Sequence, residues 1–139
     1  MSESERIAEI VYTIMDSNGT EHTVGKKTVT IKPLDGMWRE CVCLFLVTAV
    51  QYLKENSETK DKPTFSDLYS FTRKAWGMEE NELEAMFGSN DASVAYQCYM
   101  NFTQKSGKIV KSAIIAANTE LERIFFDDEK KALLQQCFE

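Results

Sequence analysis

Hydrophobic residues follow two different patterns along the chain, one before Pro33 and one after it. In residues 6–32, the segments IVYTIM and TVTIK alternate and are rich in β-branched and aromatic residues, which favours β-strands. Between them, Asn18-Gly19 can adopt the positive φ angles of a tight hairpin turn. Gly25 marks either a bulge in one long hairpin or a second turn. We therefore expect an antiparallel hairpin or a three-stranded meander over residues 6–32.

Helical patterns follow Pro33, which ends the sheet, and Asp35, which can cap the first helix. We expect helices over residues 36–55, 65–76, 79–87, 90–106, 108–125 and 128–138. Thr64 with Asp67 resembles a capping pair, and Gly77 and Gly88 suit helix C-termini. Gly107 either separates two helices or weakens a single one over 90–125. The expected fold is a single α+β domain, residues 1–139, with the small sheet packed against a bundle of five or six helices (36–138).

The segment RECVCLFLVTAVQYLKE, residues 39–55, contains the densest apolar run of the sequence. Its continuously apolar part is about ten residues, or roughly 15 Å of helix, which is about half of what a membrane span requires. Apolar residues occupy nearly all sides of the expected helix, as is typical of a helix in the middle of a fold. We expect this segment to form the centre of the core and the protein to have no membrane contact.

Composition and charge narrow the class of protein further. The chain has 139 residues, 43% of them hydrophobic, and its size suits one globular domain. Its net charge of −6 makes direct nucleic-acid binding unfavourable, because phosphate backbones are usually met by basic surfaces. The first residues, MSESERIAEI, lack the features of a signal peptide. A cytoplasmic protein with reduced cysteines is expected.

The residues that usually carry catalysis or bind metal are sparse. Cys41 and Cys43 would lie about 200° apart around a helix, so they cannot share a metal ion, and Cys98 and Cys137 add no metal-binding spacing. His22 is the only histidine, and no nucleophile partner for it is evident. We therefore predict no cofactor, no metal site and no enzymatic activity.

Acidic residues gather without any basic residue in residues 78–91, MEENELEAMFGSND. Acidic side chains in a first helical turn interact favourably with the helix dipole, which is the structural interpretation of this cluster. The functional interpretation is a surface that docks on a basic protein, with fast and salt-sensitive association. Its candidate contact residues are Glu79, Glu80, Glu82, Glu84 and Asp91.

Two further sets of residues are candidates for contacts with a partner. Tyr96, Tyr99 and Phe102 recur every three residues and would form an interface if exposed, although aromatic residues at this spacing commonly belong to a core. Lys105, Lys108 and Lys111 could line one side of a helix and meet an anion or an acidic partner, or could simply form a solvated face.

These observations favour a non-catalytic intracellular protein that binds another protein. The expected role is an inhibitor or adaptor of the kind carried by phages or mobile elements, which docks its acidic helical surface on a basic target, including one that handles nucleic acid. The alternative is a small-molecule-binding or sequestering protein, monomeric or homo-oligomeric, with a pocket between the sheet and the helices. A DNA-binding regulator and a small enzyme are the remaining alternatives.

Overall fold

The computed structural model describes residues 2–17, 21–24, 26–30, 34, 36–57 and 62–139. Seven α-helices and two strands form in these stretches, together with the 3-10 turns η1 (Gly107–Ile109) and η2 (Gln136–Phe138). In chain order they are α1 (Glu3–Ser17), β1 (Glu21–Val24), β2 (Lys27–Thr30), α2 (Gly36–Glu55), α3 (Phe65–Trp76), α4 (Glu80–Phe87), α5 (Val94–Ser106), α6 (Val110–Arg123) and α7 (Asp128–Gln135).

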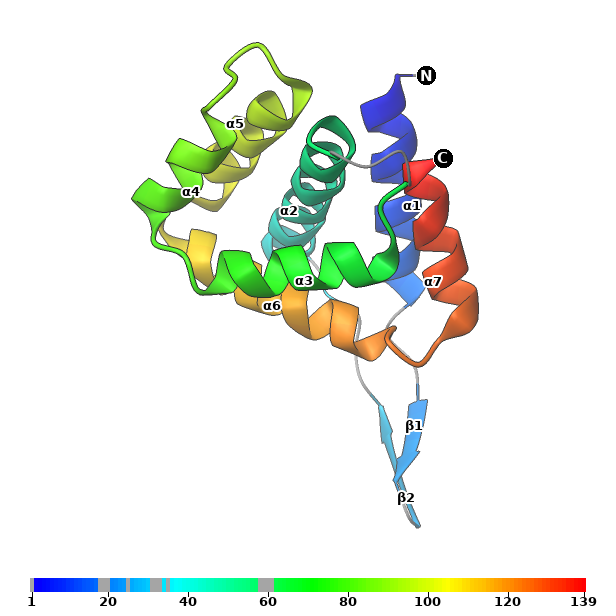
Figure 1. Cartoon of the computed structure of the whole chain (residues 1–139). Helices are drawn as coiled ribbons and strands as arrows, with labels where there is room; N and C mark the ends of the chain where they lie inside the picture. The colour runs from blue at the N-terminus through cyan, green and yellow to red at the C-terminus, as the bar shows by residue number, and fades with distance from the viewer. Residues whose placement is uncertain (1, 18–20, 25, 31–33, 35, 58–61) are drawn as a thin grey trace.

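Helix α2 is the centre of the core, as its apolar run predicts. It packs against α1, α3, α5 and α6, and Figure 1 shows it surrounded by the other helices. Apart from Leu44, every residue from Cys41 to Gln51 is buried. A helix with neighbours on nearly all sides needs apolar residues on nearly all sides. Among the described residues, no helix is both long enough and apolar enough to cross a membrane.

The N-terminal segment is helical, so the prediction of a sheet over residues 6–32 and of an α+β fold is wrong. Ile7, Val11, Ile14 and Met15 are buried on one face of α1. Their spacing of four, three and one residues is that of a helix, not the alternation of a strand. Burial of this face against α2 outweighs the strand preference of the β-branched residues, since propensity is a weak determinant beside packing. The chain is a helical fold.

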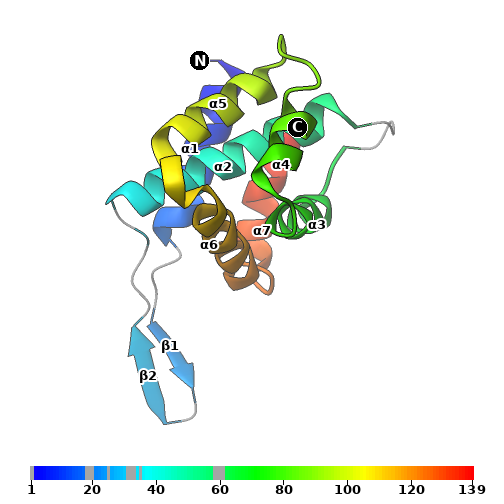
Figure 2. The ribbon, with the colours of Figure 1, turned by 90° about the vertical axis from the view of Figure 1, so that its left-hand side faces the viewer.

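The two strands form a short ladder and not a layer of the fold. Glu21 pairs with Thr30 and Val24 with Lys27, in antiparallel register. Figures 1 and 2 show β1 and β2 extending away from the helices, and neither strand packs extensively on any helix. The ladder therefore adds no face to the core. The predicted roles of Asn18-Gly19, Gly25, Pro33 and Asp35 lie outside the described residues.

The helix boundaries after residue 35 follow the predicted capping residues closely. The Thr64 backbone N–H donates to Asp67 Oδ2 at 2.8 Å, and the Asp67 N–H donates to Thr64 Oγ1 at 3.3 Å, which completes the expected capping box. Gly77 and Gly88 end α3 and α4. These short-range bonds satisfy groups at the helix ends that would otherwise lack partners.

Helix α5 starts later than predicted, and Gly107 separates it from α6. The Tyr96 N–H donates to Ser93 Oγ at 3.0 Å, so Ser93 is the N-cap, and the helix does not start at Asn90. Gly107 has φ +54° and ψ −118°, a conformation that residues with a Cβ rarely adopt. Residues 90–125 therefore contain two helices.

Candidate functional site

Helix α4 is held against the body of the protein by two buried side chains, Leu83 and Phe87. The Phe87 ring stacks on Tyr99 of α5, with centroids 4.5 Å apart and an interplanar angle of 19°, and meets Tyr52 of α2 edge-on at 5.2 Å. Offset-stacked and edge-to-face pairs of this kind orient the rings as well as burying apolar area. They fix which side of α4 faces outward.

Helix α4 and its N-cap carry the acidic surface, which we define as Glu79, Glu80, Glu82 and Glu84. All four residues are exposed. The Glu79 N–H donates to Glu82 Oε1 at 3.2 Å, so Glu82 has a structural role at the start of the helix. The structural interpretation of the acidic cluster therefore accounts for part of it, and Glu80 and Glu84 remain to be explained.

Basic residues neutralise this surface at one position. Lys111 Nζ of α6 lies 3.8 Å from Glu79 Oε1, and both side chains are at least half exposed. In the part of the chain that the structure describes, the side chains of Glu80, Glu84 and Asp91 form no ion pair or hydrogen bond. Asp91 lies in the turn before α5 and not on α4. The unpaired acidic charge is thus centred on Glu80 and Glu84.

The field of these carboxylates reaches the core below them. Burial, and to a smaller extent the negative charges of Glu84 and Glu80, together raise the pKa of Tyr99 to about 12. Tyr99 is therefore a neutral hydroxyl at physiological pH. Its electrostatic coupling indicates that both carboxylates lie on the side of α4 that neighbours α5.

A shallow hollow of about 390 Å³ borders Glu84, between α4 and α5. A Cβ at Gly88 would meet the Glu84 carbonyl oxygen at 2.7 Å and Tyr96 Cε2 at 3.6 Å, so the hollow lies beside a position where any side chain would be crowded. The half-buried Tyr96 ring forms another part of its wall. A carboxylate beside an aromatic ring is an arrangement that attracts a cationic group. The other lining residues are Asn81 and Ala85.

Of the three predicted interface aromatics, Tyr96 alone borders this surface. Tyr99 and Phe102 are 4% and 0% exposed and belong to the core. The Phe102 ring packs on Phe45 of α2 at 5.3 Å between centroids. The proposed interface of Tyr96, Tyr99 and Phe102 required an exposed strip, and the close packing of α5 on α2 buries two of its three members.

The three predicted lysine contacts do not lie along one helix. Lys105 is in α5, Lys108 in η1 and Lys111 in α6, and the turn at Gly107 separates them. Lys111 faces Glu79, whereas Lys105 borders another hollow, with Met37, Arg39 and Glu40 of α2. The expected single basic stripe is not formed.

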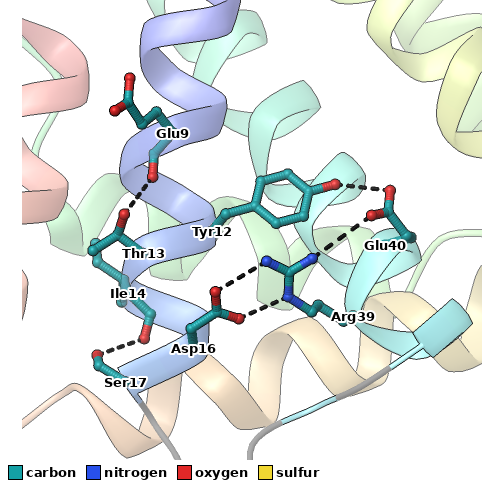
Figure 3. A network of polar contacts seen from close by, with 8 residues as sticks. All are labelled: Glu9, Tyr12, Thr13, Ile14, Asp16, Ser17, Arg39 and Glu40. Atoms are coloured by element: carbon teal, nitrogen blue, oxygen red, sulfur yellow. Dashed lines mark hydrogen bonds and ion pairs between the residues drawn. The ribbon is translucent and has the colours of Figure 1, made fainter.

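The most extensive polar network among the described residues joins α1 to α2 (Figure 3). Arg39 donates from Nε and Nη2 to the carboxylate of Asp16, at 2.7 Å and 3.0 Å, and its guanidinium lies 4.5 Å from the centroid of the Tyr12 ring. The Tyr12 hydroxyl donates to Glu40 Oε2 at 2.9 Å. This network was not predicted from the sequence, because the pattern of residues 6–32 favours strands.

The pKa shifts in this network favour a structural role. The hydrogen bonds from Arg39 lower the pKa of Asp16, while burial and then the hydrogen bond to Glu40 raise the pKa of Tyr12 above its usual value. These shifts move the pKa values of Asp16 and Tyr12 further from neutral pH, whereas a general acid or base works best with a pKa near the operating pH. The network stabilises the contact between α1 and α2.

All four cysteines are free, with no disulfide among them. Cys41, Cys43 and Cys137 are buried, and Cys98 is partly exposed. Burial raises the pKa of Cys43 to about 12 and that of Cys137 to about 11, which disfavours the nucleophilic thiolate. No group of three or more potential metal ligands occurs among the residues described. His22 lies in β1, opposite Val29.

No family model matches this sequence, and no curated protein or solved structure shows significant similarity to it.

Proposed function

We propose that this chain is a non-catalytic protein-binding protein that docks the acidic surface of α4 on a basic surface of another protein. The observation that carries the proposal is the pair of exposed carboxylates, Glu80 and Glu84, which lie one helical turn apart on α4, beside the buried residues Leu83 and Phe87 that anchor the helix. Neither carboxylate has a basic partner within the described chain. A helix fixed by its core contacts presents these charges in a constant arrangement.

Electrostatics gives this surface a specific use. Like charges placed close together repel one another, and a partner with Lys or Arg side chains relieves that repulsion on binding. The net charge of −6 adds attraction at longer range, which raises the association rate at low ionic strength. The hollow between Glu84 and Tyr96 offers one place where a partner's guanidinium or ammonium group can lie against both a carboxylate and a ring.

The described geometry gives less support to the alternative of a small-molecule site between the sheet and the helices. That pocket required the strands to pack on the helices, and β1 and β2 pack mainly on each other. The hollow beside α4 is shallow and lined largely by polar groups, whereas small-molecule sites are usually deep and mostly apolar. The broad surface of a partner protein would fit against α4 better than a small ligand would.

The proposal is tested by neutralising the two unpaired carboxylates without disturbing the helix start. The double variant Glu80→Gln with Glu84→Gln retains the Glu79–Glu82 hydrogen bond. The matched control is Glu9→Gln with Glu129→Gln, which changes the net charge equally at two exposed carboxylates outside the acidic surface. Affinity capture from the source cells should give a stoichiometric complex with a basic protein for the wild type and the control.

We expect the α4 double variant to bind that protein at least about tenfold more weakly, mainly through slower association, as surface plasmon resonance at low salt would measure. Added salt should reduce the difference between the variant and the control. If the two double variants lose affinity equally, net charge alone matters. If both bind the protein as tightly as the wild type does, α4 is not the contact surface.

A further inference from the structure

Large aromatic side chains are exposed on the surface that α3 shares with the turn after α6. We define the aromatic strip as the exposed Trp76, Phe125 and Phe126 together with the partly exposed Tyr69 and the buried Phe65 that their rings adjoin. Phe126 is 91% exposed, Phe125 43% and Trp76 37%. Single exposed apolar residues are common, but a nearly bare phenylalanine beside other exposed rings is not explained by packing within one copy of the chain.

The strip is continuous. The Phe125 ring lies 5.8 Å from Tyr69, 6.2 Å from Phe65 and 5.0 Å from Phe126, between centroids. The guanidinium of Arg73 lies 6.0 Å from the Tyr69 ring and 5.2 Å from the Trp76 ring, and so connects the two ends. Tyrosine, tryptophan and arginine are the residue types most enriched at the energetic centres of protein interfaces.

The exposed area is large enough to matter for association. Aromatic side chains bury about 150–250 Å² each, so the exposed fractions of Phe125, Phe126 and Trp76 amount to a few hundred Å² on one side of the molecule. Exposed apolar patches of this size on single domains commonly mark interaction sites.

The charges around the strip indicate what covers it. Arg73 Nη1 lies 3.2 Å from Glu122 Oε1, and Lys131 Nζ lies 3.6 Å from Asp128 Oδ1. Lys131 Nζ also lies 5.9 Å and 5.6 Å from the centroids of the Phe65 and Phe125 rings. Each of these cations thus has an acidic neighbour, and the border of the strip is balanced, unlike the acidic surface of α4.

This balance suits a second copy of the same chain. Two copies with a net charge of −6 repel each other, and the repulsion is weakest where each contributes equal numbers of acidic and basic groups. In a two-fold contact, each copy supplies the same residues, so one surface must offer both the inserting side chain and the site that receives it. The strip offers both: the protruding Phe126 and the rings of Tyr69 and Phe125.

We propose that two copies of this chain associate through their aromatic strips, with Phe126 of each copy packed against Tyr69 and Phe125 of the other. The cations Arg73 and Lys131 then lie within reach of the acidic groups of the opposite copy. This interface is independent of the acidic surface of α4, which is formed by other residues.

The test compares two substitutions at exposed apolar positions. Phe126→Ser removes the protruding ring, and Met100→Ser is the control, at a 42% exposed residue of α5 outside the strip. Sedimentation velocity over a range of protein concentrations measures the monomer–dimer equilibrium, and circular dichroism checks that both variants are folded. We expect concentration-dependent dimers for the wild type and the control, and at least about tenfold weaker dimerisation for Phe126→Ser.

A photo-crosslinking amino acid at position 126 then locates the contact. In a mixture of isotope-labelled and unlabelled copies, cross-links between copies should fall on residues 65–76 and 122–131. The proposal is overturned if the wild type remains monomeric at every concentration, if Met100→Ser weakens the dimer as much as Phe126→Ser, or if the cross-links fall elsewhere.

Discussion

Arg39 and Asp16 connect the start of α2 to the end of α1 through two parallel hydrogen bonds, although 23 positions separate them in the sequence. A planar guanidinium matches a carboxylate in this bidentate way, which fixes orientation better than a single contact does. The pair therefore holds together the two helices between which the strands are inserted.

Replacing Asp16 by Asn should lower the free energy of unfolding by about 1 kcal/mol or less, because the pair is partly solvent-exposed. The Asp16 pKa is lowered in the folded state, so this stabilisation is present above the ordinary aspartate pKa and is lost as the pH falls through the folded value. Urea unfolding should therefore distinguish wild type from variant near about pH 7 and less so near about pH 3. Asp91→Asn, at an exposed carboxylate with no ion pair among the described residues, is the control and should show no such pH dependence.

A side chain at position 107 should destabilise the protein. The Gly107 φ of +54° with ψ of −118° lies in a region that favours glycine, so Gly107→Ala should cost about 1–3 kcal/mol. Gly77→Ala is the matched control, because its φ is −82° and an added Cβ would meet only the Lys74 carbonyl oxygen, at 3.6 Å. Thermal unfolding of the two variants measures the difference. If the two variants lose the same stability, the turn between α5 and α6 differs from the one described.

Phe102 and Tyr96 should differ strongly in their effect on stability, although they lie on the same helix. Phe102 is fully buried against Phe45, so Phe102→Ala should cost about 3–5 kcal/mol. Tyr96 is half-buried beside the hollow at α4, and Tyr96→Ala should cost much less. Chemical denaturation measures the free energy of unfolding of both variants. If the two variants lose similar amounts, Phe102 is not a core residue in contrast to Tyr96.

Cys98 should react with a thiol reagent before the other three cysteines. It is partly exposed, whereas Cys41, Cys43 and Cys137 are buried. Burial raises the thiol pKa of Cys98 as well as that of Cys43, to about 12, and of Cys137, to about 11, so exposure is what distinguishes Cys98. Mass spectrometry after brief labelling of the folded protein should find modification at Cys98, with the other sites labelled only after denaturation. Early labelling of Cys43 would argue against the described packing of α2.

The Tyr99 pKa should report the charge of the acidic surface. It is about 12 in the wild type, raised first by burial and further by Glu84 and Glu80, so neutralising both carboxylates should lower it. Because the folded pKa is raised, the associated stability is complete below the unfolded value of about 10 and is lost as the pH rises through the folded value. NMR titration of the Tyr99 ring in Glu80→Gln/Glu84→Gln measures the shift. The Glu9→Gln/Glu129→Gln control should leave it nearly unchanged.

The helices after residue 35 could be predicted because local and global signals agree there. Residues 36–55 and 65–76 match α2 and α3, since apolar spacing and the Thr64–Asp67 capping box favour the same boundaries. The prediction of strands in residues 6–17 is wrong because Val and Ile favour strands only on average, whereas the helical spacing of Ile7, Val11, Ile14 and Met15 lets α1 bury one face.

The candidate site was predictable only in part, because exposure depends on tertiary packing. The acidic residues of α4 are exposed, as any unpaired carboxylate is expected to be, but the sequence could not show that Lys111 approaches Glu79 across helices. Nor could it show that Tyr99 and Phe102 face α2 while Phe126 faces outward. Aromatic residues have similar spacing in a core and at an interface, so pattern alone does not separate the two.

The position of the β-ladder has a consequence for how this chain can vary. Asp16 and Arg39 bring the ends of α1 and α2 together, and the β1–β2 ladder contributes little to the packing of the helices. Changes of length or sequence in the ladder should be tolerated far more readily than changes within α2. The ladder is accordingly a natural place to graft a foreign peptide.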